Sequence, residues 1–296
     1  MTAMRDISAA VIQLRAGPDI GRCIAAAVSR CREAVDAGAE IIVLPENYWG
    51  ITSTETKATI AVDLDNAANS PLLGPFLALS RLAPRAWILL GGLPERPSAS
   101  DGAADAGLLY NSLVTVHRGQ VVARYRKIHR FDADLPSGVV LRESATTAAG
   151  QRPVVLQTPA AAIGLSICYD LRFPSLYGAL VEAGAEVIVA PSAFTLETGV
   201  DHWQVLVRAR ALDTQCYVLA PGLCGQHNEQ RHSFGHSMIV DPWGTVIAHA
   251  PRGQAVLYAR LSREYLDQIR RELPILRHQV LSQGPAADRI DLRGLT

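Results

Sequence analysis

The sequence predicts an α/β protein built from two similar halves, packed sheet against sheet into one four-layer α-β-β-α domain. Short, continuous apolar runs rich in β-branched residues are typical of strands buried on both faces, and AEIIVLPEN and EVIVAPSAF are two such runs. Segments with helical periodicity separate these runs, and the same order of elements occurs twice. Of the 296 residues, 49% are apolar, which is enough to build a sizeable core.

The first half begins with a strand in ISAAVIQLRAG, which starts at Ile7. A helix follows, because Ile24, Val28, Cys31 and Val35 recur at the spacing of one helical face, and this places Cys31 in the core. Strands are then expected in AEIIVLPEN and AWILLGGLPE. The segment NSLVTVHRGQVVARYRK alternates around a glycine-containing turn, as a β-hairpin does.

The second half repeats this order. A strand is expected in AAIGLSICYD, a helix in SLYGALVEAGA, strands in EVIVAPSAF and CYVLAPGLC, and a hairpin in HSMIVDPWGTVIAHA. Within the chain, AGAEIIVLPE from Ala37 aligns with AGAEVIVAPS from Ala183, and Gly92 aligns with Gly222. This repeat predicts two halves related by a pseudo-two-fold axis. Residues 1–278 are expected to form one domain, whereas 279–296 are polar and aperiodic and are expected to be a tail that is loosely held or docked on a partner.

Charge and cysteine content argue against several classes of function. Lys and Arg (28) balance Asp and Glu (28), so no basic surplus favours nucleic acid or a membrane surface. The first residues lack the pattern of a secretory signal, and no apolar run is long enough to span a bilayer. Five cysteines are an odd number spread through a long chain, which fits a reducing cytoplasm.

Cys168 is the first residue whose position indicates chemistry. It ends the apolar run AIGLSIC and precedes a helical stretch, so its sulfur should lie on a strand-to-helix turn, where backbone N–H groups can bind an anion. Only the thiolate attacks, and a helix N-terminus or a nearby cation such as Lys127 lowers the pKa of a thiol. The alternative is an inert buried cysteine, which describes Cys31 and Cys216 well.

Glu46 and Lys127 are the candidate partners of Cys168. Glu46 follows a buried strand, and in α/β folds ligands bind beyond the carboxyl ends of strands, where a carboxylate can act as a base. Lys127 follows the first hairpin in ARYRKIHRFD. Taken singly, Glu46 also fits a solvated or helix-capping acid, and Lys127 also fits a solvated basic patch.

The set of motifs resembles the nitrilase-like carbon-nitrogen hydrolase superfamily. LPENYWG, RKIHRFD and SICYDLRFP are similar to its Glu, Lys and Cys motifs, in the same order, and the likeness continues through FTLETGVDHWQVLVRARALDTQCYV and GHSMIVDPWGTVIA to about residue 280. The resemblance implies an α-β-β-α sandwich and a Glu46–Lys127–Cys168 triad. It also implies that Glu143, in VLRES, supports the lysine. From the chemistry of these residues we expect the Lys127 ammonium group and a backbone N–H near Tyr169 to hold an oxyanion.

By this resemblance the chain hydrolyses a small amide through a thioester on Cys168 and needs no cofactor. CGQHNEQRHSFGHSMIVDPWGTV and RRELPILRHQV resemble most closely the branch that hydrolyses deaminated glutathione, while KIHRFD and FTLETG also resemble the ω-amidase branch. Other aliphatic amidases and nitrilases remain alternatives, as does a catalytically silent binding protein of the same fold. Relatives assemble through helices beside the nucleophile, so a homodimer or larger homo-oligomer is expected.

Two other kinds of site are weighed against the triad. Cys224, His227, His232 and His236 have a spacing that zinc would accept, but the surrounding stretch resembles an ordinary loop of the family, so no metal is expected. A Cys–His dyad with His129 or His202 would leave the glutamate and lysine unexplained.

Fixed positive charge is expected near the triad, because both candidate substrates are anionic. Arg172 is a candidate for pairing with a carboxylate, although an internal ion pair with Asp170 is an equal alternative. Arg130 stands where the family commonly has leucine, so we expect it to add affinity for a second carboxylate.

Overall fold

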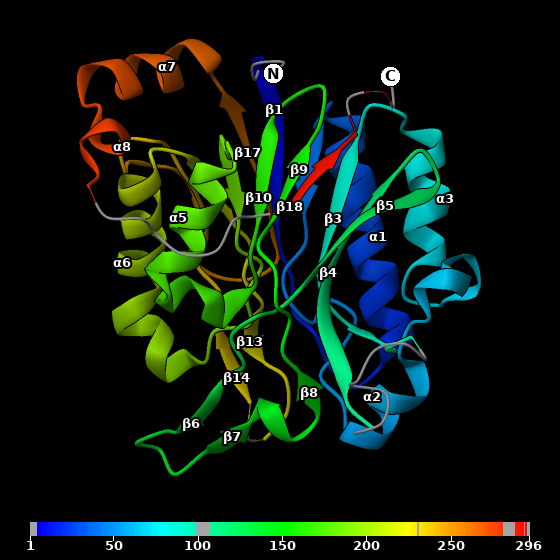
Figure 1. Cartoon of the computed structure of the whole chain (residues 1–296). Coiled ribbons are helices and arrows are strands. Elements are labelled where there is room, and N and C mark those ends of the chain that lie inside the picture. The colour runs from blue at the N-terminus through cyan, green and yellow to red at the C-terminus, as the bar shows by residue number, and fades with distance from the viewer. Residues whose placement is uncertain (1–4, 99–106, 230, 281–287, 293, 295–296) are drawn as a thin grey trace.

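The computed structural model describes residues 5–98, 107–229, 231–280, 288–292 and 294. Two β-sheets lie face to face, and helices cover the outer side of each sheet (Figure 1). The first sheet is covered by α1 (Ile20–Asp36) and α3 (Gly74–Leu82), and the second by α5 (Pro174–Glu182) and α6 (Leu196–Thr214). Helix α2 (Thr54–Ile60), which contains no buried residue, contacts β3 and lies below α1 and α3 in this view. The four-layer sandwich predicted from the sequence is therefore confirmed.

The first sheet has the central order β17-β1-β2-β3-β4-β5. Strands β1, β2 and β3 are parallel, β4 and β5 form the predicted antiparallel hairpin, and β17 pairs antiparallel with β1. The short β8 (Thr147–Ala148) pairs with β4. The strands are β1 (Ile7–Gln13), β2 (Ile41–Val43), β3 (Trp87–Glu95), β4 (Leu109–His117), β5 (Gln120–Arg126) and β17 (Ala255–Leu261).

The second sheet has the order β16-β15-β12-β11-β10-β9-β18 and repeats the plan of the first. Strands β10, β11 and β12 are parallel, β15 and β16 form an antiparallel hairpin beside β12, and β9 pairs antiparallel with β10. Its strands are β9 (Val154–Gln157), β10 (Ala162–Leu165), β11 (Val187–Val189), β12 (Tyr217–Ala220), β15 (Ser237–Val240), β16 (Val246–Ala250) and β18 (Asp288–Asp291). The shared plan confirms the internal repeat that the sequence predicted.

Burial on both faces explains why the central strands are continuously apolar. In β1, Ala9 and Val11 belong to the core between the two sheets, whereas Ala10 and Ile12 belong to the core beneath the helices. Side chains alternate along a strand, so each strand supplies both cores at once. On α1, Cys31 is fully buried in the core beneath the helices, as the helical spacing predicted.

The C-terminal third of the chain contributes elements that the sequence did not indicate. Strand β17 leaves the second half and joins β1 at the edge of the first sheet, and α7 (Arg263–Glu272) and α8 (Ile275–His278) follow it. Within the expected tail, β18 pairs parallel with β9 through backbone hydrogen bonds. Residues 281–287, 293, 295 and 296 of that tail lie outside the described residues.

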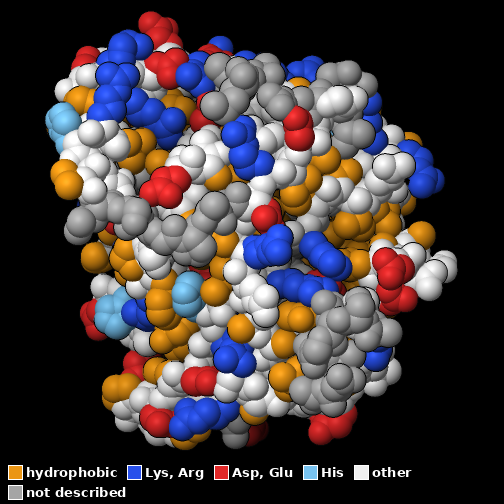
Figure 2. Space-filling view, in the orientation of Figure 1, with side chains coloured by type: hydrophobic (Ala, Val, Ile, Leu, Met, Phe, Trp, Pro, Cys, Tyr) orange, Lys and Arg blue, Asp and Glu red, His pale blue; other side chains and the backbone are white. Residues whose placement is uncertain are grey.

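The composition of the helices and the distribution of surface charge both concern possible binding partners. None of the described helices has the length and apolar composition needed to cross a bilayer. On the face seen in Figure 2, Lys and Arg side chains lie among acidic and apolar side chains and do not form one continuous basic surface.

Candidate active site

The ends of three strands bring the predicted triad together. Glu46 follows β2, Lys127 follows β5, and Cys168 follows β10 of the facing sheet. Strands β2 and β5 run in the same direction, so their carboxyl ends meet at one edge, where ligands of α/β sheets usually bind. All three residues line one cavity of about 340 Å³.

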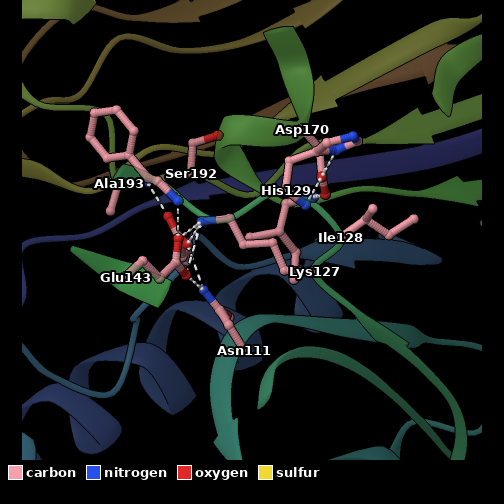
Figure 3. A network of polar contacts seen from close by, with 12 residues as sticks. Asn111, Lys127, Ile128, His129, Glu143, Asp170, Ser192 and Ala193 are labelled. Carbon is pink, nitrogen blue, oxygen red and sulfur yellow. Dashed lines mark hydrogen bonds and ion pairs between the residues drawn. The ribbon is translucent and has the colours of Figure 1, made fainter. Parts of the chain in front are cut away.

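Hydrogen-bond donors on both sides hold the Glu46 carboxylate (Figure 3). Oε1 accepts from Lys127 Nζ at 3.0 Å and from Asn111 Nδ2 at 2.9 Å, and Oε2 accepts from the Ala193 N–H at 3.1 Å. Glu46 as a whole is 4% exposed. Gly92 has a φ of 59°, and a Cβ there would lie 2.5 Å from Glu46 Cγ, so only glycine lets β3 pass this close. The carboxylate is thus fixed in one orientation.

Lys127 is a buried cation shared by two carboxylates. Its Nζ lies 3.0 Å from Glu46 Oε1 and 2.8 Å from Glu143 Oε2. Burial favours the neutral amine, but the charges of Glu143 and Glu46 outweigh it and raise the pKa of Lys127 well above its usual value. Burial likewise opposes ionisation of Glu143, but Lys127 and the Asn111 hydrogen bond lower its pKa overall. Both groups are therefore charged at neutral pH.

Cys168 lies on the strand-to-helix turn that the sequence predicted. It opens a short 3₁₀ helix, Cys168–Arg172, with a φ of 49°, an unfavourable conformation for a residue with a Cβ. Its N–H donates to the Pro191 carbonyl oxygen at 2.9 Å, which helps to hold this conformation. The side chain lines the cavity and is buried.

The protonation state of Cys168 differs from the sequence-based expectation of a lowered pKa. Burial, followed by the negative charge of Glu46, raises the pKa of the thiol well above its usual value, and the nearby Lys127 only partly opposes them. The cation that was expected to activate the thiol is instead neutralised by Glu46 and Glu143. The resting thiol is therefore protonated, and attack requires a base.

A pH titration of the free enzyme tests whether the resting thiol of Cys168 is protonated. The difference in thiolate absorbance at 240 nm between the wild type and Cys168→Ala should show no ionisation of Cys168 below its ordinary pKa of 9.0. An ionisation step of one thiol near neutral pH, absent from the variant, would show that a thiolate is formed before substrate binds.

The Tyr169 N–H is available to an acceptor beside the thiol. The neighbouring Cys168 and Asp170 N–H groups donate to the carbonyl oxygens of Pro191 and Ile167, whereas the Tyr169 N–H makes no hydrogen bond with any described residue. An unsatisfied N–H next to a nucleophile is the kind of donor that stabilises an oxyanion.

The two histidines considered as partners of Cys168 are engaged elsewhere. The backbone N–H of His129 donates to Asp170 Oδ1 at 3.1 Å, and the ring Nδ1 forms a hydrogen bond with the same oxygen at 2.7 Å. The ring also stacks on Phe173. His202 Nδ1 accepts from Arg172 at 3.2 Å. Neither histidine is among the lining residues of the two cavities that contain Cys168. The geometry therefore favours Glu46 over a histidine as the base.

The histidines that have metal-like spacing do not converge. His227 binds the Ala16 carbonyl oxygen through Nδ1 at 2.7 Å and the Ser233 hydroxyl through Nε2 at 2.8 Å. His236 pairs with His249 at 3.1 Å. In the part of the chain that the structure describes, no three His, Cys, Asp or Glu side chains are grouped so as to hold a metal ion.

Sequence reasoning missed two groups that contact Glu46. Asn111 donates to both Glu46 and Glu143 and so bridges the two carboxylates, and the Ala193 N–H reaches Glu46 from the other half of the chain. The only signal was that Asn111 is a polar residue in a strand that is buried along almost its whole length. The contact of Ala193 comes from its backbone, which no residue pattern reveals.

The arginines predicted to bind carboxylate lie outside the main cavity. Arg130 is not among its lining residues and donates to the Thr147 carbonyl oxygen at 3.4 Å. Arg172 lies over Tyr169 and Phe194 in a smaller neighbouring cavity and does not pair with Asp170. Lys57, Arg142 and Arg231 line the main cavity instead.

Known proteins share both this sequence and this fold. The chain matches the carbon-nitrogen hydrolase family over residues 8–271. It is 42% identical to a deaminated glutathione amidase of Bos taurus, over 91% of this chain and 81% of that protein. It is 39% identical to a deaminated glutathione amidase of Synechocystis, over 94% and 99% of the two chains.

Two solved structures have the same architecture. Nit3 of Saccharomyces cerevisiae, a member of the nitrilase superfamily, superposes with a TM-score of 0.81 at 28% identity, over 95% of this chain and 99% of Nit3. The NitFhit protein of C. elegans has a TM-score of 0.83 at 35% identity, over 94% of this chain, which spans 66% of that longer protein. The chain belongs to the carbon-nitrogen hydrolase family of the nitrilase superfamily and is a hydrolase that acts on carbon–nitrogen bonds other than peptide bonds.

Proposed function

We propose that this protein is a cysteine-dependent amidase in which Cys168 is the nucleophile, Glu46 the general base and acid, and Lys127 the oxyanion donor. The observation that carries the proposal is the arrangement of a buried thiol, a carboxylate held by three donors and a buried ammonium group around one cavity. Glu143 keeps Lys127 charged and in place, and the Tyr169 N–H is the second oxyanion donor.

Acylation begins when Glu46 accepts the thiol proton and Cys168 Sγ attacks the amide carbonyl carbon. Lys127 and the Tyr169 N–H stabilise the oxyanion of the tetrahedral intermediate. The carbon–nitrogen bond then breaks, and the leaving amine takes the proton from Glu46, which leaves a thioester on Cys168. Glu46 next takes a proton from water, the resulting hydroxide attacks the thioester, and the sulfur recovers that proton as the acid leaves. These steps balance without a cofactor.

Deaminated glutathione is the proposed substrate, with cysteinylglycine as the leaving amine. Support comes from relatives of that name at 42% and 39% identity and from the cationic side chains that line the cavity. An ω-amidase acting on α-ketoglutaramate is the alternative, because that substrate is also an anionic amide.

A panel of amides tests this function. Purified enzyme is incubated with deaminated glutathione, α-ketoglutaramate, a neutral aliphatic amide and a nitrile, and the released amine or ammonia is measured. The proposal expects the highest kcat/KM with deaminated glutathione. Preference for α-ketoglutaramate would support the amidase activity but contradict deaminated glutathione as the substrate. No release from any compound would favour the binding-protein alternative.

Replacing Lys127 by methionine tests its role. We expect kcat to fall about 100- to 1000-fold, the usual cost of removing an oxyanion donor, and stability to fall because two buried carboxylates lose their cation. Turnover is measured at a temperature at which circular dichroism shows the variant to be folded. Near-normal kcat in the folded variant would exclude Lys127 as the donor.

We also propose that the protein is cytoplasmic and forms a homodimer or a larger homo-oligomer. All five cysteines are free thiols, which fits a reducing compartment. Helix α6, next to the nucleophile turn, exposes the apolar side chains Val200 and Val205 (63% and 66%), and Trp243 beyond it is 51% exposed. Light scattering on the purified protein gives its mass in solution, and a monomer at micromolar concentration would refute the assembly.

A further inference from the structure

Two of the four cationic side chains that line the catalytic cavity form no ion pair with an acid among the described residues. Lys127 is paired with Glu46 and Glu143, and Arg142 binds Asp134 at 2.6 Å and nearby carbonyl oxygens. The ammonium group of Lys57 and the guanidinium group of Arg231 form no hydrogen bond or ion pair with any described residue. Since unpaired charges in a cavity favour a ligand of opposite charge, these two groups need an explanation.

The backbone around each cation is held in place. Lys57 lies in the first turns of α2, whose N-cap Ser53 accepts from the Thr56 N–H, and its own N–H donates to the Ser53 carbonyl oxygen at 3.0 Å. The side chain of Lys57 is only partly exposed and faces the cavity.

Arg231 lies between β13 (Cys224–Gln226) and β14 (His232–Phe234). Its N–H donates to the Asn228 side chain at 2.8 Å, and its carbonyl oxygen accepts from the His227 N–H at 2.8 Å. The ring of His227 is itself fixed by two hydrogen bonds. Arg231 is exposed, so it lies at the rim while Lys57 lies deeper.

The positive charges of Lys57 and Arg231 lie close enough to affect each other. Burial first, and then the positive charges of Lys127 and Arg231, lower the pKa of Lys57, although Glu143 and Glu46 oppose them. A carboxylate bound between Lys57 and Arg231 would favour the charged ammonium group of Lys57 and offset its repulsion by Arg231. Aliphatic neutral amides offer no such compensation.

We propose that Lys57 and Arg231 form a carboxylate-binding site of the catalytic cavity, through which the enzyme selects anionic amides. This inference rests on the proposed amidase function and names the part of the site that recognises charge. Thr52, which precedes α2, and Thr54, its first residue, also line the cavity and add hydroxyl groups on the same side. Arg130, the residue that the sequence indicated for this role, lies outside the cavity lining.

A second cavity gives the substrate room beyond the reactive carbonyl. It has a volume of about 410 Å³ and shares Ile51, Leu141, Ala193, Thr195 and Arg231 with the catalytic cavity. Its other walls are largely apolar, with Leu135, Val139 and Val200 among them. Arg231 therefore lies where the two cavities join, which suits a carboxylate on either the acyl or the amine part of a longer amide.

Matched substrates and variants test the site. Glutaramate and pentanamide differ only in a carboxylate on the acyl side, and N-acetylglycine and N-ethylacetamide differ only in a carboxylate on the amine side. For each pair, the ratio of kcat/KM for the anionic to the neutral amide is measured in the wild type, Lys57→Met, Arg231→Met and Lys57→Arg. Arg130→Leu is the control, because it removes a nearby cation that does not line the cavity.

We expect Lys57→Met and Arg231→Met each to lower this ratio by about 10- to 100-fold for one pair, the usual cost of a lost charged hydrogen bond, and that pair identifies the end that binds. Lys57→Arg should recover most of the ratio, and Arg130→Leu should retain it. A wild type without preference for anionic amides, or ratios unchanged in both methionine variants, would overturn the carboxylate site while leaving the amidase function intact.

A binding measurement separates the two proposals if the wild type hydrolyses none of these amides. Glutarate should then still protect Cys168 from alkylation by iodoacetamide, and Lys57→Met should need about 10- to 100-fold more glutarate for equal protection. Equal protection in both proteins, or none in the wild type, would overturn the site.

Discussion

Replacing Cys168 by alanine is expected to lower kcat by on the order of 10⁵-fold or more, as removal of a catalytic nucleophile does in other hydrolases. The remaining groups bind and polarise the amide but cannot form the thioester. The substitution removes one buried sulfur at a turn, so the fold should persist, and thermal unfolding checks this. Amine release is measured with the best substrate of the panel.

Cys31→Ala is the matched control for that experiment. Cys31 is also a buried thiol, but it lies on α1 in the core beneath the helices. Its replacement should leave kcat close to that of the wild type. Loss of activity in Cys31→Ala but not in Cys168→Ala would remove Cys168 from the mechanism.

Replacing Glu46 by glutamine is expected to lower kcat by on the order of 10³- to 10⁴-fold, because the amide cannot carry the proton in either half of the reaction. Lys127 keeps Glu143 as a partner, and the glutamine oxygen can still accept the hydrogen bonds of Lys127 and Asn111. The site should therefore keep its geometry while losing its base. Single-turnover measurements should show both acylation and deacylation slowed.

Glu40→Gln provides the control for this charge removal. Glu40 lies at the opposite end of β2, is 7% exposed and pairs with the more exposed Arg5 and Arg85. This variant should show unchanged kcat at a temperature at which it is folded, whereas its stability should fall because a buried charge pair is broken. If Glu46→Gln retained a tenth or more of wild-type kcat, another group would have to carry the proton.

The spacing of apolar residues in the sequence was enough to predict the helices and strands whose buried residues recur at regular intervals. The spacing of Ile24 and Cys31 predicted α1, and continuous β-branched runs predicted β2 and β11, because burial on both faces leaves no polar position. Strand β17 was missed because its residues are only partly buried and its partner, β1, lies at the other end of the sequence. Strand β18 was missed because its sequence is mostly polar. Backbone pairing with β9 holds it in the sheet, and such pairing leaves no pattern of apolar residues.

The residues of the site also differ in how far the sequence could predict them. Glu46, Lys127 and Cys168 each follow a predicted strand, but only the resemblance of their motifs to a known family indicated that the three belong to one site. Lys57 lies in α2, a helix without a buried residue, and its sequence TETKATI is typical of a solvated surface helix. Its place in the cavity depends on how α2 packs beside β3, which no local pattern contains. Arg130 was expected to bind a carboxylate because it stands where the family commonly has leucine, but its side chain does not line the cavity.

The most direct test of the account is to find the acyl group on the enzyme. Wild-type enzyme is mixed with excess deaminated glutathione, quenched in acid within the first turnover, digested and analysed by mass spectrometry. The peptide containing Cys168 should carry the acyl group of the substrate, hydroxylamine should remove this group, and Cys168→Ala should lack it. Turnover without any acylated Cys168 peptide at any quench time, or an acyl group on a different residue, would contradict a thioester mechanism at Cys168.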